Sequence, residues 1–232
     1  MQPWDTRYVI ATIAAASNQD EPTMKLYGCR TAIIATIVSL LAVGPASAHH
    51  LMGGKLPSTF TEGLLSGLGH PVIGPDHLAF LVAIGLIVGV QRLPLALPAF
   101  FVAAMAVGVW MHIHAISISA AEVIVGTSVL VVGILVAIGR ALSASGWVAV
   151  FVVGGLFHGY AFGESIFGAE TSPLGAYLLG LVLIQSTLTV GIALLVRLIG
   201  ASSASQRGPR LLGAGIAGVG FMVLIGHLVP SM

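Results

Sequence analysis

The stretch PLGAYLLGLVLIQSTLTVGIALLV, residues Pro173 to Val196, decides the fold of this chain. It contains no charged side chain and is longer than the ~20 residues that an α-helix needs to cross a bilayer. The rest of the chain is similar, because 57% of the 232 residues are hydrophobic and only 7% are charged, against roughly 25% in soluble domains. The composition therefore predicts an all-α membrane protein. A formal net charge of +1 offers no basic face for a nucleic acid.

The expected spans follow from six apolar stretches: Pro75 to Val90, Leu95 to Ala115, Ser119 to Ile138, Trp147 to Phe162, Pro173 to Val196 and Leu211 to Val229. In hydrocarbon each stretch must be a helix, because only a helix satisfies its own backbone there. A short outer helix, Thr59 to Gly69, is expected before them, and Pro71 should end it. Since the connections are short, we expect a polytopic helix bundle that forms one membrane domain, residues 49–232.

Residues 24–48 have the organisation of a cleavable signal peptide within an N-terminal extension, residues 1–48. Met24, the expected start of translation, is followed by basic residues, an apolar core from Ala32 to Val43, and an A-x-A cleavage site at residues 46–48. The alternative is an uncleaved first transmembrane helix, but the apolar core is shorter than the ~20 residues of a span. Cleavage removes Cys29, the only cysteine, and so excludes disulfides and thiolate metal sites.

The basic residues test the topology that signal cleavage implies. If the mature chain begins outside at His49, five arginines fall in cytoplasmic loops, where Lys and Arg are concentrated. They are Arg92, Arg140, Arg197, Arg207 and Arg210. Only Lys55 falls outside. We therefore expect a multi-pass protein of the bacterial inner membrane with both mature termini in the periplasm.

This topology places all eight histidines at the outer side of the membrane. They are His49, His50, His70, His77, His112, His114, His158 and His227. Four acidic residues near the ends of the expected spans lie on the same side: Asp76, Glu122, Glu164 and Glu170. Imidazole and carboxylate without thiolate suit Ni²⁺, Co²⁺ or Zn²⁺, and ionisable groups at membrane depth usually mark an ion path. The alternative is that these residues lie at the hydrated membrane interface and bind no ion.

The densest cluster is GHPVIGPDH, residues 69–77. Pro71 and Pro75 interrupt the helical ladder there, and Gly74 frees the turn between them. Pro75 suits the first helical position of the next span, which places Asp76 in a first turn whose dipole favours an acid. With the helix broken, His70, Asp76 and His77 can converge on one metal ion.

A second cluster is HGYAFGE, residues His158 to Glu164. The two clusters together resemble the HupE/UreJ family of nickel permeases, and the resemblance extends from His49 to the carboxyl end. It implies uptake of nickel, sometimes cobalt, across a bacterial inner membrane to supply hydrogenase or urease. Many relatives carry a further histidine where this chain has Phe162, so the resemblance leaves open the number of ligands in this span and the preferred metal.

Several candidates remain open from the residues alone. His158 and Glu164 lie on different sides of a straight helix, so they meet one ion only if Gly159 and Gly163 relax it; otherwise His158 is packed and Glu164 solvated. Their spacing repeats that of His70 and Asp76 in a span of opposite direction, which suggests inverted three-plus-three repeats.

Three further groups of residues are ligand or pathway candidates. His112 or His114 can share an ion with Glu122, or lie at the interface beside Trp110. His49 and His50 can form a chelate at the mouth, or be disordered. The run Gln185-Ser186-Thr187 can line the route inward, or bond between helices, and we take Tyr160 and His227 as core or interface residues.

We therefore expect a carrier of a divalent transition metal, most of all Ni²⁺, with Co²⁺ or Zn²⁺ as alternatives. No catalytic residue or cofactor is expected, because the chain lacks H-E-x-x-H, G-x-S-x-G and a Walker loop. An intramembrane metal-dependent hydrolase and a metal sensor remain the alternatives from other classes. The expected partners are the metal ion and the lipid bilayer, and the oligomeric state is open.

Overall fold

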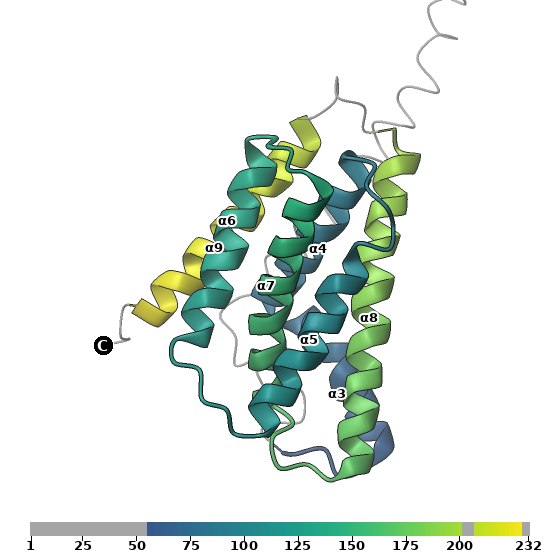
Figure 1. Cartoon of the computed structure of the whole chain (residues 1–232), viewed down its shortest axis with the longest axis vertical. Coiled ribbons are helices and arrows are strands. Elements are labelled where there is room, and N and C mark those ends of the chain that lie inside the picture. Colours follow the sequence, from purple (N-terminus) through teal and green to yellow (C-terminus); the bar gives the residue numbers. More distant parts are fainter. Residues whose placement is uncertain (1–54, 201–206, 229–232) are drawn as a thin grey trace, which may run out of the picture. The chain divides into compact units, whose positions relative to one another are not determined.

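The computed structural model describes residues 55–200 and 207–228, which form seven helices and no strand (Figure 1). The helices are α3 (Phe60–Ile73), α4 (Pro75–Val90), α5 (Pro98–Ile113), α6 (Ala121–Ala137), α7 (Ala144–Glu164), α8 (Thr171–Leu198) and α9 (Arg207–Leu228). The all-α architecture that the sequence predicts is thereby confirmed. The expected signal peptide, the start at Met24 and the candidate ligands His49 and His50 lie outside the described residues.

Three helices, α7, α8 and α9, are long and apolar enough to cross a membrane. The pair α3 and α4 passes the same test as one broken span, bent by 77° at its break. The other two, α5 and α6, are shorter apolar helices of 16 and 17 residues. The chain is therefore a multi-pass membrane protein, embedded in a lipid bilayer.

The break between α3 and α4 lies one turn later than the sequence predicts. The prediction that Pro71 ends the short helix at Gly69 is wrong, because α3 continues through Pro71 to Ile73. A proline in the last turn removes only one backbone donor, and the chain keeps its helical course. The break occurs at Gly74, whose φ of −72° and ψ of 111° are extended, since a residue before proline is driven out of the helical region. Pro75 then begins α4 as predicted.

The central helix of the bundle is α4, in which every residue from Asp76 to Gly89 is buried. It packs against α3, α6, α8 and α9. Gly85 permits a close approach of α4 to α8, because a Cβ there would lie 2.6 Å from the Cβ of Ile192. A helix that is apolar on all sides is expected to be buried all round, and α4 follows that rule.

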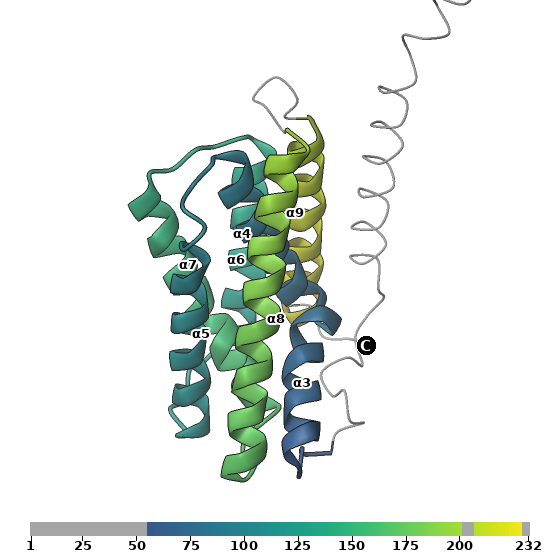
Figure 2. The same cartoon turned by 90° about the vertical axis from the view of Figure 1, so that its right-hand side faces the viewer.

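The broken pair runs alongside α8 in the same direction (Figure 2). Gly67 of α3 lies against Tyr177 in the first half of α8, and Gly89 of α4 lies against Val196 near its end. The break with Asp76 and His77 therefore lies beside the part of α8 between these two contacts, inside the bundle.

Charge is segregated between the two ends of the helices. The arginine end, where α4, α6 and α8 finish, carries Arg92, Arg140, Arg197, Arg207 and Arg210. Side chains link its turns, since Gln91 Nε2 donates to the Arg140 carbonyl at 3.5 Å and Arg197 donates to the Leu93 carbonyl. The opposite end, which we call the histidine end, carries His114, Glu122, Glu164, Glu170 and His227.

Candidate metal site at the helix break

Two buried imidazoles meet next to the helix break. His77, in the first turn of α4, and His158, on α7, are 3% and 0% exposed, and their Nδ1 atoms lie 2.9 Å apart. Asp76 is also buried, and its Oδ1 accepts the His77 backbone N–H at 2.9 Å. The extended conformation at Gly74 turns this first helical turn into the bundle. The structure therefore joins the two motifs that lie 81 residues apart in the sequence.

The tautomer of His158 follows from its hydrogen bonds. Ser128 Oγ lies 3.0 Å from His158 Nε2, and its own hydroxyl hydrogen is donated to the Val125 carbonyl at 2.7 Å. The serine oxygen must then accept a hydrogen from Nε2, which leaves a lone pair on His158 Nδ1. That lone pair is directed at His77 Nδ1. An outer hydrogen bond that fixes which nitrogen is free is the usual environment of a histidine that binds metal.

The distance between the two nitrogens suits a shared cation as well as a hydrogen bond. Metal–imidazole bonds are about 2.0–2.1 Å long, so two such ligands at a right angle lie about 2.9 Å apart. A hydrogen on His77 Nδ1 or a metal ion can therefore occupy the space between the rings. No other described imidazole pair makes this contact.

Aromatic side chains enclose the pair. The ring of Phe162 lies 4.2 Å from that of His77, and the ring of Phe80 lies 4.5 Å from that of His158, centroid to centroid. Phe101 adds a third wall at 6.0 Å from His158. A polar pair in such an apolar enclosure interacts strongly with a bound cation, because little water screens it.

His70 lies beside the pair but does not complete it. Its ring is 5.8 Å from that of His77, and its Nδ1 is 3.1 Å from Ser165 Oγ and 3.4 Å from the Tyr177 hydroxyl. Phe162 touches the His70 ring at 5.2 Å as well as His77. Among residues 55–200 and 207–228, no group of three or more His, Cys, Asp or Glu side chains has the geometry to hold a metal ion. The sequence predicts that His70, Asp76 and His77 converge on one ion. In the structure the ring nitrogens of His77 and His158 face each other, and Asp76 and His70 lie next to this pair.

The remaining candidates lie elsewhere. Glu164 is exposed at the end of α7, away from His158. His114 is exposed too, donates Nδ1–H to the Trp110 carbonyl at 2.8 Å and stacks on the Trp110 ring. His112 packs its ring on Tyr160 with centroids 4.6 Å apart, and its buried Nδ1 lacks a hydrogen-bond partner among the described residues. The structure brings none of these three to the His77–His158 pair.

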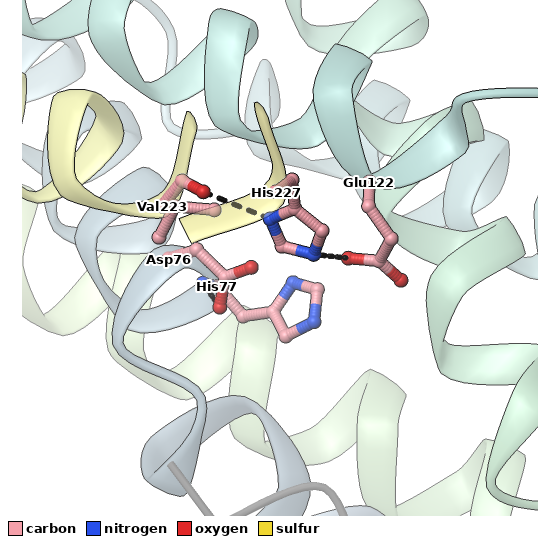
Figure 3. A network of polar contacts seen from close by, with 5 residues as sticks. All are labelled: Asp76, His77, Glu122, Val223 and His227. Atoms are coloured by element: carbon pink, nitrogen blue, oxygen red, sulfur yellow. Dashed lines mark hydrogen bonds and ion pairs between the residues drawn. The ribbon is translucent and has the colours of Figure 1, made fainter. Parts of the chain in front are cut away.

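Glu122 meets a different histidine from those that the sequence suggests. Its Oε2 lies 3.7 Å from His227 Nε2, at the histidine end of α6 and α9 (Figure 3). Sequence reasoning missed His227 as a partner, and it also missed Ser128 as the residue that orients His158. The predicted topology could have suggested the Glu122–His227 contact, because the third span begins and the sixth span ends at the same end of the bundle.

Gln185 is a buried polar residue in the interior of α8. Its side chain is fully buried, and neither atom of its amide has a hydrogen-bond partner among the described residues. Thr189, one turn further towards the arginine end, is buried and donates to the Gln185 backbone carbonyl at 2.7 Å. An unpaired amide in such surroundings costs on the order of 1–3 kcal/mol, so it calls for a ligand or water.

Comparison with known proteins gives this geometry its context. The model of the HupE / UreJ protein family matches residues 36–223. The chain belongs to this family. It is also 30% identical over 199 residues to Protein HupE of Rhizobium leguminosarum bv. viciae, a match that covers 83% of this chain and 97% of the relative. No solved structure matches the chain significantly.

Membership of the HupE/UreJ family decides the class of function. These are metal permeases and not enzymes, so the chain's role lies in metal transport. The hydrolase alternative is thereby set aside, and the helix break with its two histidines lies within the part of the chain that the family model matches.

Proposed function

We propose that this HupE/UreJ protein carries a divalent transition-metal ion, Ni²⁺ above others, inward across the bacterial inner membrane. The ion binds between His77 Nδ1 and His158 Nδ1, with Asp76 balancing its charge. The observation that carries the proposal is the buried 2.9 Å approach of these two nitrogens, one of which already has its lone pair directed at the other.

The donor set suits nickel and related divalent metals. Two imidazoles and a carboxylate suit Ni²⁺, Co²⁺ and Zn²⁺. Tetrahedral ligands at about 2.05 Å lie about 3.3 Å apart, whereas ligands at a right angle lie about 2.9 Å apart. The observed 2.9 Å is compatible with the right angle of octahedral or square-planar coordination, and a hydrogen bond between the two rings has the same length.

The proposed topology has six spans and both mature termini in the periplasm. In this arrangement the arginine end is cytoplasmic, which the distribution of basic residues supports. His158 lies six residues before the end of α7 at Glu164, and Tyr177, beside His70, lies six residues after the start of α8. At 1.5 Å of rise per residue, both are about 9 Å inside the helix ends. The proposed site thus lies inside the bundle, below its outer surface.

Helix packing supports an inverted repeat of α4 to α6 and α7 to α9. Exchanging the halves maps α4 onto α7, α5 onto α8 and α6 onto α9. The packed pair α4/α8 then corresponds to the packed pair α5/α7, and α4/α9 corresponds to α6/α7. The pair α4/α6 has no counterpart of comparable extent in α7/α9 among the described residues, and α3 stands outside the repeat.

Release towards the cytoplasm runs along α8 in this proposal. Gln185 and Thr189 follow Tyr177 on one buried stripe of α8, at intervals of four or eight residues that share a helix face. The unpaired amide of Gln185 gives the ion, or its water, a polar contact between the site and the arginine end.

The test is uptake of radioactive nickel into proteoliposomes that contain the purified protein, with Co²⁺ and Zn²⁺ as competitors. His77→Gln and His158→Gln should each reduce the initial rate at least tenfold. His114→Gln, which changes an exposed histidine away from the site, should transport like wild type. Normal transport by both site variants would overturn the proposal, and binding without flux in the wild type would favour a metal sensor instead.

A further inference from the structure

The outer pair, His227 on α9 and Glu122 on α6, is a second place where an imidazole faces a carboxylate. His227 Nε2 and Glu122 Oε2 are 3.7 Å apart, beyond the 2.7–3.2 Å of a hydrogen bond. Both side chains are about one-third exposed, at 37% and 33%, so an ion can reach them from outside the bundle.

Hydrogen bonding fixes the orientation of the His227 ring. Its Nδ1 lies 2.8 Å from the Val223 carbonyl, which can only accept, so Nδ1 carries the hydrogen. In neutral histidine Nε2 then presents a lone pair to the carboxylate. Two electron-rich atoms face each other across this gap, and the arrangement is favourable only when a positive charge lies between them or on the ring.

The distance between His227 Nε2 and Glu122 Oε2 suits a cation that is bound by both atoms. With metal–nitrogen and metal–oxygen bonds of about 2.1 Å, donors 3.7 Å apart subtend an angle of about 125° at the metal. The Nδ1–H bond to a backbone carbonyl is the outer contact that orients most metal-binding histidines. His114 has the same bond to its own helix but faces no carboxylate among the described residues.

The position of the outer pair connects it to the buried site. Figure 3 shows the pair over the first turn of α4, where Asp76 and His77 lie. The three helices concerned, α4, α6 and α9, pack on one another. Ser128, which bonds His158, lies six residues further along α6 than Glu122, or about 9 Å deeper.

We infer that His227 Nε2 and the Glu122 carboxylate form a second divalent-cation site, which captures the ion at the histidine end and passes it to Asp76, His77 and His158. The inference rests on the proposed function, because it supplies the entry step of the same route. Two donors from the described part of the chain contact the ion there, so the rest of its shell stays hydrated and binding is weak and fast. A capture site needs both properties, since an ion held tightly at the mouth would not move on.

Equilibrium binding of Ni²⁺ to the purified protein tests the outer pair directly. The wild type should show a tight and a weak class of site. His227→Gln and Glu122→Gln should each lose the weak class and raise the KM of nickel uptake about tenfold or more, with the maximal rate nearly unchanged. His77→Gln should lose the tight class and keep the weak one, which separates this inference from the proposed function.

Two further variants separate a metal site from a simple ion pair. His114→Gln is the matched control, because it removes an exposed histidine with the same backbone bond, and it should leave both classes intact. His227→Lys keeps a positive partner for Glu122 but offers no neutral imidazole. Normal KM in His227→Lys, or a persistent weak class in both His227→Gln and Glu122→Gln, would overturn the inference. A wild type that binds no Ni²⁺ would overturn it together with the proposed function.

Discussion

Replacing Ser128 with alanine is the sharpest probe of how the buried site is organised. Ser128 touches no proposed ligand atom, since it contacts His158 at Nε2 and the ion is assigned to Nδ1. Its hydroxyl hydrogen is committed to the Val125 carbonyl, and the serine oxygen therefore holds His158 as the Nε2–H tautomer. In Ser128→Ala that constraint is lost, and the buried Nε2–H has no acceptor.

The magnitude follows from the role of such outer partners. Removing the hydrogen bond that orients a metal-binding histidine typically costs 10- to 100-fold in affinity, or about 1.4–2.7 kcal/mol. We expect this loss in the tight class of Ni²⁺ sites, measured by equilibrium dialysis or titration calorimetry. Ser128→Thr keeps the hydroxyl and should restore most of the affinity.

Thr127→Val is the matched control on the adjacent residue. The Thr127 hydroxyl also donates to its own helix, at 2.6 Å from the Val123 carbonyl, but the side chain is exposed. This variant should bind Ni²⁺ like wild type. If Ser128→Ala also binds like wild type, the tautomer of His158 does not depend on Ser128 and the reasoning from hydrogen bonds to free nitrogen fails.

Three other substitutions have expected outcomes. Phe162→His places a third imidazole against His70 and His77, so Ni²⁺ affinity should rise in the same binding assay, whereas Phe151→His, which lies against Trp147, should give no gain. Gln185→Leu removes a buried amide that has no hydrogen-bond partner among the described residues, so the unfolding temperature in detergent should rise. Nickel flux should fall while tight binding persists, and unchanged flux would place the route elsewhere. Gly85→Ala should lower the free energy of unfolding by about 1–3 kcal/mol, because the new Cβ collides with Ile192. Gly191→Ala, which has open space around it, should not lower it, and equal unfolding temperatures for the two variants would refute the close packing of α4 on α8.

Much of the architecture could be predicted, because a segment enters the bilayer according to its hydropathy, which follows directly from the sequence. The apolar stretches from Pro75 to Leu228 correspond to helices in the structure, with bounds that shift by a few residues. The Gly74-Pro75 break was also predictable, since a proline restricts the residue before it whatever its surroundings. Pro71 was misjudged because His70, which also precedes a proline, keeps its helical conformation, and in the last turn Pro71 removes only one backbone donor.

Pairing between distant helices was harder to predict from sequence. His77 and His158 meet because α4 and α7 approach at Gly154, where the Phe80 ring takes the place that a Cβ would fill. Sequence proximity suggested that Glu122 would share an ion with His112 or His114, across one short turn. In the structure α5 packs closely on α7 and α6 on α9, so Glu122 is carried to His227 instead. Which helix faces which depends on side-chain packing summed over whole helices, and no local motif encodes it.

The central claim is that His77 and His158 bind the same metal ion through their imidazole nitrogens. X-ray absorption at the nickel edge measures it most directly. The sample is the His227→Gln protein loaded with one equivalent of Ni²⁺, in which the outer pair cannot bind nickel. The account predicts at least two imidazole nitrogens at about 2.0–2.1 Å, with one fewer after His158→Gln is added. An identical nickel shell with and without His158 would contradict it.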